Sequence, residues 1–344
     1  MKRISVFLDK LFVEHTNGPG HPESPERILA IVDSLKEHGL FERLVKLPPR
    51  DATEEEITMV HTPSHYYKIQ STRGKQRVFL DADTSTCPVS FDAAVRAVGA
   101  VLSAVDSVMD GTLDIGFPLV RPPGHHAEAD RAMGFCLFNN IAIGAAHAMR
   151  KWGLSRILIV DWDLHHGNGT QRTFYNIPEV LYFSTHQYPH YPGTGKFGEV
   201  GVDRGEGYTI NVPLHPGMGD REYVKIFSEI LGPVISQFEP ELILVSAGFD
   251  TYVEDPLGGM KVTPEGFAIQ ARYLKEKAEE YCSGKIVYVL EGGYNLEGLW
   301  LSAKSVFEEL FELVRTDYGD LESPTNADQI IEHVKEVHSK YWKF

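Results

Sequence analysis

Long apolar runs are missing from this sequence of 344 residues. No stretch approaches the roughly 20 consecutive apolar residues that a helix needs to cross a bilayer. The opening segment, MKRISVFLDK, has only a short apolar stretch before Asp9 and Lys10 interrupt it, which does not fit a secretory signal. We therefore expect a protein that has no membrane partner.

Cysteine is also scarce, and positive charge forms no block. Cys87, Cys136 and Cys282 lack the C-x-x-C spacing, which argues against a disulfide scaffold or a thiolate zinc site and favours a cytoplasmic protein. Lysine and arginine number 33 against 48 acidic residues, a net charge of −15, so nucleic acid is not an expected partner. The acidic balance instead favours the approach of cationic substrates.

Short apolar runs rich in β-branched residues are present throughout the chain. They predict strands at residues 3–8, 116–120, 157–160, 180–183, 208–212, 242–246 and 286–290. A helix is expected over residues 23–38, a capping box at Thr53 and Glu56 begins another, and Thr263 before Pro264 begins a third. Alternating strands and helices predict an α/β fold with a parallel sheet covered on both faces.

Two parts of unequal size are expected along the chain. No repeat or linker divides residues 1–315, which we interpret as one domain. Residues 316–344 begin with turn-rich sequence and continue into an amphipathic helix, which packs either on the body or on another subunit of a homo-oligomer. In that helix His333 and His338 are expected to be solvated, whereas His147 is expected to pack within its own helix.

Polar side chains follow four of the predicted strands. The run ILIV is followed by DWDLHHGNG, in which Asp161, Asp163 and His165 point to one side of an extended chain because side chains alternate. Asp250 follows another strand. Two of the first three residues together with Asp250 make a set of two carboxylates and one imidazole, which suits a catalytic Zn²⁺, and Fe²⁺ or Mn²⁺ would also accept these ligands.

The other two strand ends carry His125 with His126, and Tyr294. Ligands of open α/β sheets bind beyond the carboxyl ends of the strands, so all four groups should meet at one rim if the sheet is parallel. A single histidine or aspartate at such a place is most often a surface residue or a satisfied partner. Four strand ends with titratable groups together indicate a catalytic site.

These segments resemble the metal-dependent histone deacetylase family, in the class II type and its prokaryotic relatives. The resemblance extends from residue 3 to about residue 313 and rests on HPESPER, RPPGHHA, GFCLFNN, DWDLHHGNGTQ, YPGTG, SAGFD and LEGGYN. It implies the arginase/deacetylase fold, a three-layer α/β sandwich with a mostly parallel sheet. It also makes residues 1–315 a deacetylase catalytic domain.

The resemblance implies a zinc-dependent amidohydrolase that removes acetyl or other short acyl groups from lysine side chains. Its Zn²⁺ ligands would be Asp163, His165 and Asp250. His125 and His126 would be the catalytic pair, and Tyr294 would donate a hydrogen bond to the substrate carbonyl.

Asp161 has two implied roles. It would pair with His125, whereas His126 faces Asn168 in place of the carboxylate of other family members. His126 is then expected to be the neutral base and His125 the more cationic partner. Asp161 would also bind a monovalent cation, K⁺, with the backbone carbonyls of Asp163 and His165 and with Ser184 and Thr185; the alternative is a carboxylate satisfied by His125 and backbone N–H groups alone.

A narrow channel for the substrate is implied at Gly134, Phe135 and Tyr191, with Asp83 at its rim. Polyamine-selective members carry an acidic residue at the position of Leu257, so this chain is expected to act on acyl-lysine peptides or proteins. Two alternatives remain open: an acetylpolyamine amidohydrolase, and an inactive protein that only binds acyl-lysine.

Three other interpretations of motifs are not supported. GTGKFGEV at residues 193–200 fits a kinase phosphate loop, but the other kinase motifs are missing, and we assign this loop to the pocket rim. No G-x-S-x-G elbow is present, so a serine hydrolase is not indicated. An arginase-like site with two metals would show D-x-H-x-D, whereas this chain has D-x-D-x-H, which indicates one metal.

Overall fold

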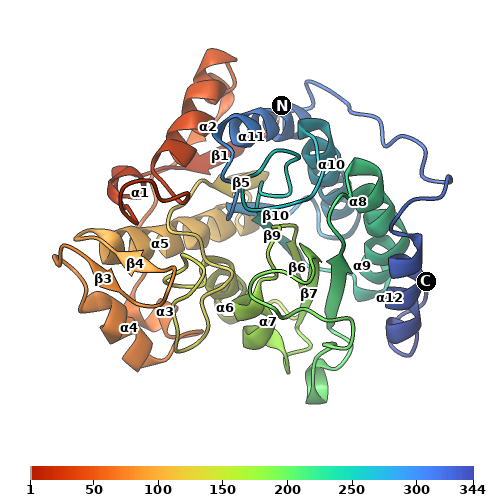
Figure 1. The fold of residues 1–344 in the computed structure, drawn as a ribbon, viewed down its shortest axis with the longest axis horizontal. Coiled ribbons are helices and arrows are strands. Elements are labelled where there is room, and N and C mark those ends of the chain that lie inside the picture. Colours follow the sequence, from red (N-terminus) through yellow and green to blue (C-terminus); the bar gives the residue numbers. More distant parts are fainter. Residues whose placement is uncertain (1) are drawn as a thin grey trace.

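Apolar strands build one parallel sheet through the centre of the molecule (Figure 1). The structure is a computed structural model and describes residues 2–344. Within this range every pairing in the main sheet is parallel. The strand order is β2 (Val45–Lys46), β1 (Ile4–Phe7), β5 (Ile115–Pro118), β10 (Ile286–Leu290), β9 (Leu242–Ala247), β6 (Ile157–Asp161), β7 (Val180–Gln187) and β8 (Thr209–Leu214).

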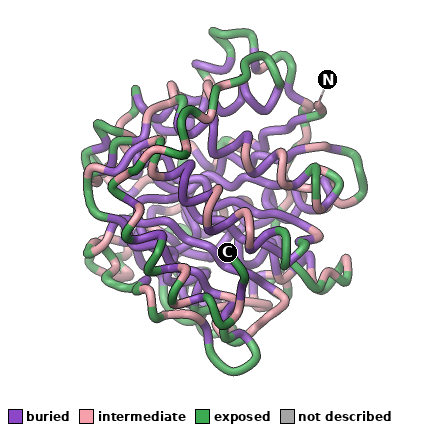
Figure 2. The backbone as a smooth tube through the Cα atoms, turned by 90° about the vertical axis from the view of Figure 1, so that its right-hand side faces the viewer, coloured by how far each residue is buried: buried purple, intermediate pink, exposed green. Residues whose placement is uncertain are grey.

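Helices cover both faces of this sheet, as Figure 1 shows. Helices α5 (Ser90–Met109) and α6 (Asn140–Trp152) pack together on one face, and α2 (Glu26–Glu37), α10 (Pro264–Tyr281) and α11 (Leu296–Leu310) form the other layer. The interior strands are fully buried, and Figure 2 places the exposed segments at the periphery. The predicted α/β three-layer architecture is confirmed.

Short elements complete the chain. Strands β3 (Val78–Phe79) and β4 (Ser85–Thr86) form a small antiparallel hairpin. The remaining helices are α1 (Lys10–Glu14), η1 (Phe41–Arg43), α3 (Glu54–Ile57), α4 (Pro63–Gln70), α7 (Asn168–Phe174), η2 (Asp203–Gly205), α8 (Asp220–Ile226), η3 (Phe227–Leu231), α9 (Gly232–Phe238) and α12 (Asp328–His338).

Two of the helix starts predicted from the sequence are confirmed, and one is wrong. Thr53 and Glu56 form the capping box, and Thr263 caps α10. Helix α2 begins at Glu26, so the expectation of a helix from residue 23 is wrong. Glu23 instead turns into the core, where its carboxylate accepts hydrogen bonds from the buried Arg121.

Helix α12 packs on the body beside β8 and η3. Lys335 Nζ lies 2.7 Å from Glu229 of η3, and Trp342 Nε1 donates to the Gly207 carbonyl at 2.8 Å. His338 is 1% exposed, so the expectation that it is solvated is wrong. His147 packs within its helix, where its Nε2 lies 2.9 Å from Asp106. No helix among residues 2–344 is long and apolar enough to cross a membrane.

Candidate active site

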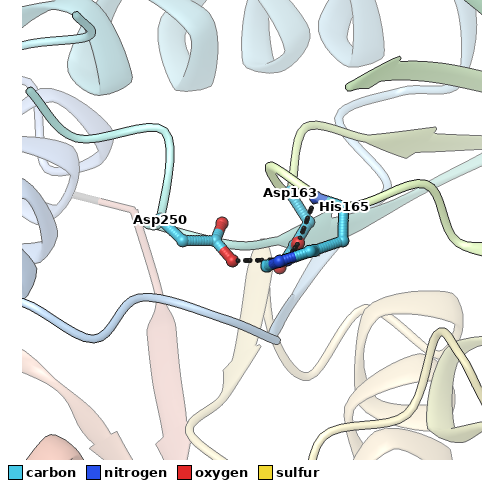
Figure 3. A group of neighbouring side chains, drawn as sticks. All are labelled: Asp163, His165 and Asp250. Atoms are coloured by element: carbon cyan, nitrogen blue, oxygen red, sulfur yellow. Dashed lines mark hydrogen bonds and ion pairs between the residues drawn. The ribbon is translucent and has the colours of Figure 1, made fainter. Parts of the chain in front are cut away.

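Three ligand-type side chains meet beyond the ends of β6 and β9 (Figure 3). His165 Nδ1 lies 3.1 Å from Asp163 Oδ1 and 3.1 Å from Asp250 Oδ2. One ligand atom from each of these residues lies within 4.8 Å of the others, and all three residues are buried. Strands β6 and β9 are direct neighbours. This brings Asp250 beside Asp163 and His165, which lie 87 and 85 positions earlier in the sequence.

Backbone N–H groups orient the two carboxylates. Gly292 N donates to Asp163 Oδ2 at 2.8 Å, and Leu164 N donates to Asp250 Oδ1 at 2.9 Å. A side chain at Gly292 would collide with the Asp250 carboxylate, so glycine is needed here for the close approach. The local backbone therefore holds both carboxylates beside the His165 ring.

The electrostatics of this trio favour a bound cation. Burial and the charge of Asp163 raise the pKa of Asp250 to about 7. Burial opposes the charged form of His165, but hydrogen bonds to Asp163 and Asp250 outweigh it and raise its pKa to about 10. A divalent cation would offset the cost of gathering two buried carboxylates. One imidazole nitrogen and two carboxylate oxygens suit Zn²⁺, Fe²⁺ or Mn²⁺.

The contribution of Asp250 to the stability of the metal-free protein is expected to fall as the pH rises from about 4 to 7, whereas buried histidines with lowered pKa values, such as His61 and His166, contribute in the opposite direction. In this range the folded protein keeps a proton on Asp250 that the unfolded chain, with an ordinary pKa near 3.9, has released. The stabilising contribution is complete below the lower pKa and is lost as the pH passes the higher one. The contribution of Asp250 is therefore measured as the difference in thermal unfolding between chelator-treated wild type and a variant that cannot titrate at this position, followed across this pH range.

The Asp250→Asn variant is the matched control for this pH dependence. It cannot titrate at this position, so the unfolding temperature of the wild type should decrease relative to that of the variant between about pH 4 and pH 7. Equal slopes for the wild type and the variant would contradict the expected role of Asp250.

The tandem histidines lie beside this trio in unlike surroundings. His125 Nδ1 is 3.1 Å from Asp161 Oδ2, whereas His126 Nδ1 is 2.8 Å from Asn168 Oδ1. Burial disfavours the His125 cation, but the charges of Asp163 and Asp161 outweigh burial and raise its pKa well above the ordinary value. Burial and the charge of His125 hold the pKa of His126 well below its ordinary value. The two rings therefore differ in charge.

A pocket of about 240 Å³ joins most of the remaining predicted residues. It is lined by Asp83, His126, Gly134, Phe135, His165, His190, Tyr191, Leu257 and Tyr294. The Phe135 and Tyr294 rings meet edge to face with centroids 5.9 Å apart, and Tyr191 meets His126 at 5.1 Å. The pocket thus has aromatic walls and reaches His126 and His165.

The wall at Gly134 and Phe135 is an unusual turn. Both residues have positive φ, 56° and 68°. Asp83 Oδ1 accepts a hydrogen bond from Gly134 N at 3.1 Å, and Thr84 Oγ1 accepts one from Phe135 N at 3.0 Å. Asp83 therefore lies at the pocket and also stabilises the turn that forms its wall.

Asp161 does not join the trio. Its carboxylate accepts hydrogen bonds from Tyr182 Oη at 3.0 Å and from Asp163 N at 3.2 Å, in addition to its contact with His125. The Ser184 hydroxyl lies 2.9 Å from His186 Nδ1. The Thr185 hydroxyl is buried and has no hydrogen-bond partner.

Two residues of the site were not singled out from the sequence. Glu291 is buried, accepts hydrogen bonds from Gly124 N at 2.7 Å and His125 N at 3.2 Å, and has a pKa raised by burial to about 7. Its position directly after a buried strand was a usable signal. His190 stacks on His165 with centroids 5.2 Å apart and contacts the Leu257 carbonyl at 3.0 Å. Its only signal was its place next to Tyr191.

Known proteins resemble this chain over most of its length. The family model "Histone deacetylase domain" matches residues 21–310. A "Probable deacetylase" of Archaeoglobus fulgidus is 39% identical over 98% of both chains. "Polyamine deacetylase HDAC10" of Homo sapiens is 40% identical over 93% of this chain.

The chain spans about half the length of the human protein and of two Arabidopsis thaliana relatives, "Histone deacetylase 5" and "Histone deacetylase 18". The structure titled "Crystal Structure of HDA15 HD domain" superposes with a TM-score of 0.92 at 38% identity, covering 99% of this chain and 95% of that one. The chain therefore belongs to the histone deacetylase family.

Proposed function

We propose that this family member is a zinc-dependent hydrolase that removes acetyl or other short acyl groups from lysine side chains. Its family supports hydrolysis of acetylated amides. The observation that carries the proposal is that His165, which belongs to the trio with Asp163 and Asp250, lines the same aromatic-walled pocket as His126 and Tyr294. A flat acetyl amide on a methylene chain fits such a narrow space.

The three residues of the trio would hold the metal ion. A divalent ion there supplies Lewis acidity, which polarises an amide carbonyl and makes a water molecule more acidic. Zn²⁺ is the expected ion, and Fe²⁺ is an alternative with the same ligands. The buried backbone donors at Gly292 and Leu164 keep both carboxylates in place.

The histidines and the tyrosine would handle the protons and the developing charge. His126, neutral because its pKa is low, takes the proton of the attacking water. Tyr294 at the pocket wall donates its O–H to the oxyanion of the carbonyl. His125, cationic beside Asp161, supports proton delivery to the leaving amine. The products are a free acid and an amine.

A monovalent cation, K⁺, is proposed next to Asp161. The buried Thr185 hydroxyl without a partner supports this, because such oxygens are rarely left unsatisfied. Ser184 pairs directly with Asp161 across β6 and β7. The backbone carbonyls of Asp163 and His165 complete the proposed set.

Leu257 favours acyl-lysine over acetylpolyamine as substrate. It lines the pocket and offers no charge to a second ammonium group of a polyamine. Polyamine deacetylation is the second candidate, supported by the 40% identity to a relative named a polyamine deacetylase and by the net charge of −15. We place the catalytic domain in residues 1–315 and treat residues 316–344 as an extension.

The variant Leu257→Glu is expected to raise the preference for acetylpolyamine relative to acetyl-lysine by about tenfold or more, since a carboxylate a few ångströms from an ammonium contributes on the order of 1–4 kcal/mol. The ratio of kcat/KM for N8-acetylspermidine and for an acetyl-lysine peptide measures this. Leu257→Gln is the control, because it adds polarity without charge. A similar shift in both variants would contradict the charge argument.

One experiment tests the proposed function as a whole. Purified protein is analysed for metal content and assayed on a fluorogenic acetyl-lysine peptide and on N8-acetylspermidine, each with and without a chelator and a hydroxamate. Stoichiometric zinc and chelator-sensitive turnover of the peptide are expected. A marked preference for the polyamine would reverse the substrate ranking. Full metal loading without turnover of either substrate would instead indicate a protein that only binds acyl-lysine.

A further inference from the structure

A buried carboxylate lies two residues after His126 in the chain. Asn168 stands between His126 and this residue, Glu128: its Oδ1 is 2.8 Å from His126 Nδ1, and its Nδ2 donates to Glu128 Oε1 at 2.7 Å. His126, Asn168 and Glu128 are 3%, 4% and 6% exposed respectively. Glu128 does not line the acyl pocket.

Two arginine side chains lie against the other carboxylate oxygen of Glu128. Arg172 Nη1 lies 2.7 Å and Arg131 Nη2 lies 3.1 Å from Glu128 Oε2. An ionised carboxylate only accepts hydrogen bonds, and guanidinium groups only donate them. Glu128 Oε1 therefore accepts a hydrogen bond from Asn168, and Asn168 must present its NH₂ group to it.

The hydrogen bond to Glu128 determines which way the Asn168 amide faces. Its NH₂ must point to Glu128, so its carbonyl oxygen must point to His126. An oxygen acceptor at that place requires a proton on His126 Nδ1. The other ring nitrogen, Nε2, then carries the free lone pair, as a base that accepts the proton of water must.

We propose that Glu128 is a positioning residue that fixes the tautomer of His126 through the Asn168 amide. The proposal rests on the proposed function, in which His126 is the base. An aspartate at position 168 would accept from His126 in either orientation, whereas asparagine has two unlike ends and needs a group that orients it. Glu128 supplies that group through the shortest contact of Asn168 Nδ2, at 2.7 Å, while the His126 backbone carbonyl and Met133 Sδ, each at 3.4 Å, are weaker acceptors.

A purely structural role for Glu128 is the competing explanation. Its ion pair with Arg172 ties the loop after the tandem histidines to helix α7. A structural role predicts loss of stability or of substrate affinity. The tautomer role predicts loss of kcat at constant KM. It also predicts that kcat recovers when the carboxylate and the amide are exchanged between positions 128 and 168.

The first test is Glu128→Gln in the full-length, metal-loaded protein. The carbonyl of the new amide at position 128 must face Arg172, so its NH₂ faces Asn168, the Asn168 amide turns over, and the proton of His126 moves to Nε2. We expect kcat to fall roughly 10- to 100-fold, the usual range for loss of a group that orients a catalytic side chain, with KM unchanged.

The decisive test is the exchanged pair Glu128→Gln with Asn168→Asp. Asn168→Asp alone should also lower kcat, because it places a second carboxylate against Glu128. In the double variant the carboxylate at position 168 accepts from both His126 and the amide NH₂ at position 128, so the Nδ1-protonated tautomer returns. We expect kcat of the double variant to exceed that of each single variant by roughly tenfold.

The chain contains a matched control. His166 Nε2 lies 2.8 Å from Gln171 Oε1, and Gln171 Nε2 donates to Glu199 at 2.7 Å, which is the same order of imidazole, amide and carboxylate. Neither His166 nor any residue of the 193–200 loop lines the acyl pocket, so the expectation that this loop forms the pocket rim is wrong. Glu199→Gln should therefore leave kcat nearly unchanged, and it controls for the cost of a buried Glu→Gln change.

Nitrogen NMR of the histidine rings gives a readout independent of turnover. The His126 ring should show a proton on Nδ1 in the wild type and in the double variant, and on Nε2 in Glu128→Gln. Losses of kcat that multiply in the double variant, or an unchanged tautomer in Glu128→Gln, would overturn the proposal. An inactive wild type with the Nδ1 tautomer present would count against the proposed function alone.

Discussion

The Asp250→Ala variant is expected to lose both its metal and its activity. Asp250 supplies one of only two carboxylates in the trio, and its Oδ2 lies 3.1 Å from His165 Nδ1. Loss of the Lewis acid costs several kcal/mol of transition-state stabilisation, which corresponds to a fall in kcat/KM of about 10³-fold or more. Metal content measured by mass spectrometry and turnover of an acetyl-lysine peptide are the two readouts.

Asp220→Asn is the control for loss of a carboxylate away from the pocket. Asp220 accepts hydrogen bonds from Thr263 at the start of α10, at 2.8 Å from its N and 2.7 Å from its Oγ1, and does not line the acyl pocket. This variant should keep its metal and turnover. If Asp250→Ala kept a full equivalent of zinc and wild-type turnover, the metal site proposed here would be wrong.

The His126→Ala variant is expected to lose more activity than His125→Ala. His126 is held neutral by burial and by the neighbouring cation, so it is the ring able to accept a proton. Removal of a general base lowers the rate by about 10²- to 10⁴-fold. His125 is held in its charged form by Asp163 and Asp161 and supports the later proton transfer. Steady-state kcat of the two variants with metal content confirmed gives the comparison.

Equal losses in the two alanine variants would contradict this division of roles. Variants at His125 and His126 do not remove a predicted metal ligand, so both proteins should bind zinc. A variant that loses zinc is excluded from the comparison, because its rate would report the metal rather than the histidine. The order of the two rates, with His126→Ala slower, is the result that supports the assignment.

Local sequence patterns predicted most of the main sheet. The runs ILIV, LILVS and IVYVL became β6, β9 and β10 within one residue of the expected bounds. Burial on both faces of a parallel sheet demands continuous apolar residues, which makes such strands easy to find. The two-residue strand β2 and the hairpin of β3 and β4 were missed, because segments this short carry no detectable period.

Side chains whose surroundings come from distant segments were harder to predict. The amphipathic pattern of α12 predicted one buried face without indicating that His338 belongs to it. His338 is buried because the helix packs beside β8. Glu23 was expected inside a helix, but pairing with Arg121 holds it in the core before the helix begins. Strand β8 is far from His338 in the sequence, and Arg121 is far from Glu23.

The sequence by itself determined the α/β class, the family and the candidate ligands, because apolar runs and the polar residues directly after them are local features of the chain. Only the tertiary structure decided that β9 lies beside β6, which brings Asp250 to His165. Only the tertiary structure placed Glu128 behind Asn168 and His190 against His165. Such contacts depend on strand order and loop paths, which are set by the packing of the whole chain and not by any local pattern.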